Sequence, residues 1–173
     1  MPNTQVGKIY KPATVDFGEV PISSTVGGVS LGLNIATVND NQADQVVGEG
    51  LSRITANAVK VTFKTVDHSP EVMALFTGGT VDRTNANKPK LILKATGILA
   101  KGDLIILTQT DLGYPVTVTL PDAQNIPGGD LNVGAKSGGY GAELPLAFGG
   151  YWASDAAGYG HIEYDLTPLA VQP

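Results

Sequence analysis

The sequence lacks cysteine and contains no long hydrophobic run. Without cysteine the chain has neither a disulfide framework nor a thiolate metal site, a composition compatible with folding in a cytosol. Its densest apolar cluster, Leu104-Ile105-Ile106-Leu107, is far too short to span a bilayer. The first residues show no basic segment followed by an apolar one, so we expect neither a secretory signal nor a membrane partner.

Charge is also scarce. Charged residues make up 16% of the chain, against roughly 25% in an ordinary globular domain. A monomer with so little charge is poorly protected at its surface, which favours a surface partly covered by partners. A Gly-rich sandwich is the other explanation for this composition.

Turn-forming and strand-forming residues are abundant. The 173 residues include 22 Gly and 11 Pro, and Val and Thr are frequent, which is typical of strands and turns rather than helices. This length suits one domain, residues 1–173, with residues near the N-terminus forming an extended arm or short strand. Alternating segments at 90–99, 116–120 and 162–166 predict further strands, and Leu104–Thr110 predicts a strand buried on both faces.

The strongest strand pattern is a long hairpin. Apolar residues alternate with small or polar ones from Val29 to Ile35, and a second alternation runs from Val59 to Thr65. Ile54, Ala56 and Ala58 have the opposite phase, which predicts a bulge or a loop near Ala58. The tip between the two limbs is polar, and we predict that it reaches a neighbouring subunit. The residues of this tip are Asn39, Asp40, Asn41, Gln42, Ala43 and Asp44.

A single short helix is predicted directly after the hairpin. Ser69 is a good N-cap, Pro70 suits the first helical position and Glu71 favours the positive end of the helix dipole. Gly78 suits the left-handed position that ends a helix. The apolar stripe of this two-turn helix must dock on a sheet, because so short a helix does not persist alone. Together these elements predict a mainly β fold, an antiparallel β-sandwich or barrel with one short flanking α-helix and a long hairpin.

Residue patterns for chemistry are weak throughout the sequence. The two histidines, His68 and His161, lie far apart, and residues 129–137 miss the phosphate-binding loop because Ala135 separates the second glycine from Lys136. The polar tip at 39–44 lacks the ligand series and the closing Glu of a calcium loop. We therefore predict no catalytic residue, metal site or cofactor. The aromatic, Gly-rich segment 138–160 leaves open two roles for its aromatic side chains: stacking on sugar rings, or plugging a loop against the core or against a neighbour.

Charge is unevenly distributed along the chain. Residues 53–101 carry eight basic residues against three acidic ones, and residues 103–173 carry eight acidic residues against Lys136 alone. Opposite blocks on neighbouring copies would attract and fix their register. Lys60 and Lys64 lie on the polar face of one predicted strand, so we predict that both make charge contacts between subunits.

The order of parts between Val15 and Thr80 resembles the tail tube (major tail) proteins of long-tailed bacteriophages. The resemblance rests on the short first strand, Gly28-Val29-Ser30-Leu31, the long hairpin, the strand 59–64 and the helix Ser69–Gly79. It implies six copies in a ring whose inner strands form a continuous barrel, and rings stacked into a hollow tube. It also implies a protein made in the host cytoplasm and located in the virion tail. The implied partners are further copies, other tail proteins, and DNA that passes without specific binding.

Three other functions remain open at this point. A carbohydrate-binding or adhesive β-sandwich would use the aromatic segment 138–160. A head decoration protein or a tail-completion protein would share the β-rich composition. An enzyme has the least support, because no catalytic grouping is evident in the sequence.

Overall fold

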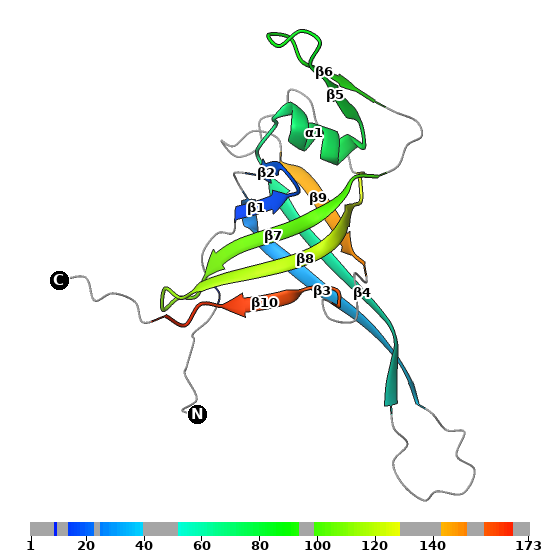
Figure 1. Cartoon of the computed structure of the whole chain (residues 1–173), viewed down its shortest axis with the longest axis vertical. Helices are drawn as coiled ribbons and strands as arrows, with labels where there is room; N and C mark the ends of the chain where they lie inside the picture. Colours follow the sequence, from blue (N-terminus) through cyan, green and yellow to red (C-terminus); the bar gives the residue numbers. More distant parts are fainter. Residues whose placement is uncertain are drawn as a thin grey trace, which may run out of the picture.

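The computed structural model describes residues 9, 14–22, 25–39, 52–93, 99–128, 143–151 and 158–167, and only the backbone of 34–39 and 52–58. This part of the chain forms ten strands and one helix (Figure 1). The elements are β1 (Thr14–Phe17), β2 (Val20–Ile22), β3 (Thr25–Asn39), β4 (Ser52–Thr65), α1 (Pro70–Thr77), β5 (Thr80–Asp82), β6 (Lys90–Ile92), β7 (Lys101–Gln109), β8 (Pro115–Asn125), β9 (Leu144–Gly150) and β10 (His161–Tyr164).

Eight of the strands form one antiparallel sheet that folds over itself. Its order is β2-β1-β7-β8-β9-β4-β3, and β10 also pairs with β8. In Figure 1 the strands β1, β7 and β8 cross in front of β3 and β4, as in a β-sandwich. The remaining strands, β5 and β6, form a separate two-stranded sheet beside α1. The predicted class, a mainly β antiparallel sandwich with one flanking helix, is confirmed.

The core lies between the two layers and is centred on aromatic rings. The Phe148 side chain, fully buried on β9, lies 4.8 Å from the Phe17 ring of β1 and 5.9 Å from the Phe63 ring of β4, measured between centroids. Alternate residues of each strand point into this space, so Val59, Val61, Phe63 and Thr65 are buried on β4. Phe148 thus joins the two layers.

Strand β8 serves both layers because a bulge reverses its alternation. Its buried residues are Val116, Val118 and Leu120 before the bulge, and Ala123 and Asn125 after it. The register with β7 shifts at the same point, between Gly102 and Leu104. Asp122, in the bulge, has a φ of 60°, which is uncommon outside glycine but tolerated by Asp. The predicted strand ended at Pro121; instead Pro121 lies at the bend, and the strand continues to Asn125.

Helix α1 agrees with its prediction residue by residue. The Ser69 hydroxyl accepts a hydrogen bond from the Val72 N–H, and Gly78 ends the helix with a φ of 69°. Val72, Leu75 and Phe76 are buried against the sheet. The C-terminal turn is fastened to β8, because the buried Asn125 amide donates to the Leu75 carbonyl over 2.8 Å.

Two details of the sequence prediction were wrong. Leu104–Thr110 was expected to be buried on both faces, but Leu107 is 44% exposed and the outer face of β7 is not covered. The bulge in β4 lies at Thr55, where the register shifts between the Ala36–Ala56 and Thr37–Ile54 pairs, and not near Ala58. Strand β6 covers only Lys90–Ile92 of the strand expected at 90–99, and residues 94–98 lie outside the described part.

Candidate functional site

The most unusual feature of the fold is the length of the β3–β4 hairpin. The two strands pair from Thr25 and Thr65 at the base to Asn39 and Ser52 at the far end. On its other edge β4 is paired by β9 only from Val59 to Thr65. The segment Ser52–Ala58 of β4 and its partner segment Asn34–Asn39 of β3 therefore form a two-stranded ribbon that leaves the body of the protein (Figure 1). At the usual rise of a strand this ribbon is roughly 20 Å long.

The outer edge of the hairpin is open and uncharged. Strand β3 pairs only with β4 among the described strands, and its fifteen residues include no charged residue and no proline. Soluble proteins normally protect a long edge strand with charge, proline or a bulge, because its free N–H and C=O groups would otherwise pair with another chain. Among the described residues, β3 itself bulges at its base, where Gly27 and Gly28 have φ values of 73° and 85°.

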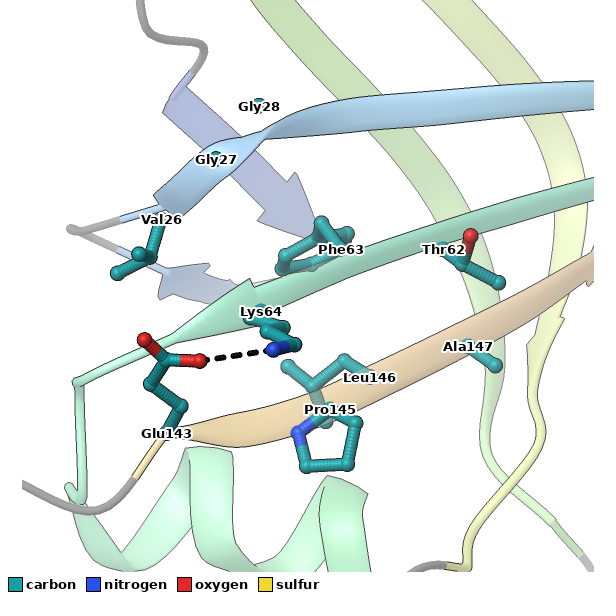
Figure 2. Close-up of a pocket in the computed structure, with 10 residues that line it drawn as sticks. All are labelled: Val26, Gly27, Gly28, Thr62, Phe63, Lys64, Glu143, Pro145, Leu146 and Ala147. Carbon is teal, nitrogen blue, oxygen red and sulfur yellow. Dashed lines mark hydrogen bonds and ion pairs between the residues drawn. The ribbon is translucent and has the colours of Figure 1, made fainter. Parts of the chain in front are cut away.

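A shallow groove of about 480 Å³ lies beside this bulge (Figure 2). Val26 and the two glycines line one side, and Pro145 and Ala147 of β9 line the other. At one end of the groove the Lys64 ammonium contacts the Glu143 carboxylate over 2.9 Å. Both side chains are substantially exposed, so this ion pair contributes only about 0.2–1 kcal/mol. The groove is open and has no further charged group, which does not suit a buried small-molecule site.

The predicted contact residues have separate outcomes. Lys64 has an acidic partner in its own chain, whereas Lys60 is exposed and has no ion pair with any described residue. Asn39 ends β3 and pairs with Ser52. The other five residues of the predicted tip, Asp40 to Asp44, lie outside the described residues. Contacts of either set with another subunit remain predictions.

The aromatic segment does not form a described sugar platform. Tyr159 packs against the core, which agrees with the alternative that aromatics plug a loop. Tyr151 is 46% exposed, and the Lys101 ammonium lies 5.1 Å from its ring centre, a cation–π contact. Tyr140 and Trp152 lie outside the described residues. Sequence reasoning missed the Lys101–Tyr151 contact, because it depends on β7 and β9 lying on opposite sides of β8.

Three carboxylates at the surface have pKa values below their ordinary ones. The pKa of Glu71 is lowered by its hydrogen bond from the Arg83 guanidinium. The pKa values of Asp82 and Asp165 are lowered in the same way, each by the hydroxyl and N–H of the threonine two residues later. These are surface turns rather than a catalytic grouping. Within the described residues no three acidic or histidine side chains cluster as metal ligands, and no helix is long and apolar enough to cross a membrane.

Comparison with known proteins shows a distant structural similarity and no family. No protein-family model matches the sequence, and no curated protein matches it significantly. Among solved structures, the chain is similar to one in the cryo-EM structure of the anti-feeding prophage baseplate, solved with six-fold symmetry. The two share 13% sequence identity with a TM-score of 0.36, and the alignment covers 95% of this chain and 92% of that chain.

Proposed function

We propose that this protein is a structural subunit of a phage tail, and that it assembles into hexameric rings which stack into the hollow tail tube. The ring of six and the tube come from the resemblance of residues 15–80 to tail tube proteins. The fold supplies an independent reason to expect assembly. In this role the chain is a building unit that acts by contact with copies of itself, and DNA passes through the tube without specific binding.

The observation that carries the proposal is the ribbon of the β3–β4 hairpin beyond Val59. A two-stranded ribbon without a third strand or a packed face is at best marginally stable in water. The ribbon stays paired to Asn39 and Ser52, with one bulge at Thr55, although β9 ends at Gly150, opposite Val59. Its cover must therefore come from outside the described body, and a neighbouring copy supplies it in a ring or a stack of rings.

The surface charge is compatible with this role. The net charge of −5 disfavours the phosphate binding that a basic protein would show, so DNA would not adhere to the wall. Three of the basic residues already pair within the chain, namely Lys64, Arg83 and Lys101. We infer that the contacts between copies rest mainly on strands and apolar surface, and that cations without an ion pair to any described residue, such as Lys60, adjust their register.

Negative-stain electron microscopy of the purified protein tests the proposal. Rings or tubes are expected, whereas dispersed small particles at all concentrations would contradict it and favour a monomeric binding module. Deletion of residues 40–43 is the matched variant, because it shortens the tip and leaves the core strands intact. The deleted protein should remain folded by circular dichroism and fail to polymerise, and normal tubes from it would show that the tip is not a contact.

A further inference from the structure

Among the described strands, three end the main sheet without a further partner: β3, β10 and β2, which is three residues long and contains Pro21. A proline protects an edge from pairing, so β3 and β10 are the edges open to another chain. Strands β9 and β10 pair with the same edge of β8, β9 at Ala123–Asn125 and β10 at Val116–Thr119, because β7 occupies the opposite edge throughout. The sheet therefore divides at the β8 bulge. One branch runs through β9 and β4 and ends at β3, and the other ends at β10.

On β3, the face that points toward the core still carries an apolar side chain beyond the point where the core ends. Val29 and Leu31 of β3 pack against the core. Leu33, two residues further on, pairs with the buried Val59 and thus faces the same side, yet it is 64% exposed. An apolar side chain so placed lacks the stabilisation that full burial would give.

The branch that ends at β10 also carries apolar side chains that are only partly buried. Ile162 and Tyr164 of β10 pair with Val118 and Val116, which are buried, and therefore face the inner side of the sheet. They remain 46% and 41% exposed. In Figure 1, β10 forms the lower border of its layer, and no described strand pairs with its free edge.

We propose that β3 of one copy pairs edge to edge with β10 of the next copy. The pairing would place Leu31 and Leu33 beside Ile162 and Tyr164 on one continuous inner face, so that the two incomplete cores complete each other. It would also provide partners for the free N–H and C=O groups of both edges. This inference rests on the proposed function, since it identifies the strands that join neighbouring subunits of a ring.

A contact between two different edges explains the surfaces better than a contact of one edge with itself. Pairing of β3 with β3 is isologous, closes at two copies and leaves β10 open. Pairing of β3 with β10 is heterologous and uses both edges on every copy, and it closes a ring when the rotation between copies is a whole fraction of a turn. Charge also permits it, because β3 has no charged residue to repel Glu163, the acidic residue of β10.

Disulfide trapping tests the pairing, because the chain has no cysteine. One cysteine is introduced on β3, as Leu31→Cys or Leu33→Cys, and one on β10, as Ile162→Cys or Tyr164→Cys. The two single variants are purified with tags of different size, mixed, assembled and oxidised. Neighbouring cross-strand residues on one face lie close enough for a disulfide. Random mixing in a ring places the matching variant beside about half of the copies, so at least one of the four combinations should convert up to about half of the mixture to a dimer that carries both tags.

The matched control is Ser30→Cys mixed with Ile162→Cys. Ser30 pairs with Thr62 and faces the other side of β3, so this mixture should give at least tenfold less of the doubly tagged dimer. A chain that carries both cysteines of the successful pair should give a covalent ladder that ends at the number of copies in the ring.

The outcomes separate this inference from the proposed function. Rings in the microscope without a doubly tagged dimer from any of the four combinations overturn the β3–β10 pairing and leave the tail role standing. A Leu33→Cys homodimer that forms in preference to the mixed dimer also overturns it. A mixed dimer from a protein that never forms rings supports the pairing and contradicts the ring.

Discussion

Replacement of Gly160 by alanine should separate a steric clash from backbone strain. Gly160 has a φ of +141°, and a Cβ there would lie 2.2 Å from the Thr119 carbonyl oxygen and 2.7 Å from Leu120 Cδ2. Gly128 is the matched control, because its φ is +142° and a Cβ there would meet no atom within 4 Å. In both alanine variants the backbone conformation disfavours a side chain, which lowers the free energy of unfolding by about 1–3 kcal/mol.

The clash adds a cost at Gly160 alone. Thr119 pairs with His161 at the first rung of β10, so relief of the clash requires β10 to move away from β8. Overpacking of this kind costs about 1–3 kcal/mol. For a chain of this size each kcal/mol lowers Tm by about 2–4 °C. The Tm of Gly160→Ala should therefore be roughly 2–12 °C lower than the Tm of Gly128→Ala.

Calorimetry at a concentration where the protein is monomeric measures this difference in Tm. Amide hydrogen exchange locates it, because Gly160→Ala should lose protection at residues 161–164 while β4 and β9 keep theirs. Equal Tm values for the two variants would refute the steric argument. Loss of β10 should also abolish ring assembly in Gly160→Ala, whereas Gly128→Ala should still assemble.

Two further predictions concern charge. Lys64→Glu should lower the free energy of unfolding by about 0.2–1 kcal/mol through loss of the Glu143 pair, whereas Lys60→Glu should leave it within about 0.5 kcal/mol; urea unfolding measures both. High salt and either reversal should slow assembly followed by light scattering, and indifference to all three would show that neither lysine lies at a contact. Because the pKa of Asp165 is lowered chiefly by the Thr167 hydroxyl, its contribution to stability is present above the ordinary pKa of Asp and is lost as the pH falls through the lowered value. Thr167→Val should raise that pKa in a carboxylate NMR titration, and an unchanged titration would contradict this cause.

Local patterns in the sequence were sufficient for the helix and the hairpin. Ser69, Pro70 and Gly78 act on the backbone within a few residues, so the limits of α1 could be predicted without knowledge of the sheet. The alternation on β4 likewise follows from burial of one face. The bend in β8 was missed because Pro121 resembles the end of a strand, and the pairing that continues beyond it, with β7 and β9, involves strands distant in the sequence.

Features that depend on partners far apart in the sequence could not be predicted. Leu107 belongs to an apolar run that resembles a strand buried on both faces, yet no layer formed by the described strands covers its side of β7. The exposure of Leu33 depends on where the core ends, because β9 stops at Gly150, opposite Val59, the partner of Leu33. The open edges of β3 and β10 are properties of the strand order and not of either strand alone.

The bulge at Asp122 connects the fold to assembly. It separates the part of β8 that pairs with β10 from the part that pairs with β9, and so sets the angle between the branch that ends at β10 and the branch that ends at β3. If these edges join neighbouring copies as proposed, the same angle sets the rotation from one copy to the next. The number of copies in a ring then follows from the bend within each copy, as well as from the contact itself. Lys101, whose ammonium lies 3.3 Å from the Asp122 carboxylate, helps to hold this bend from β7.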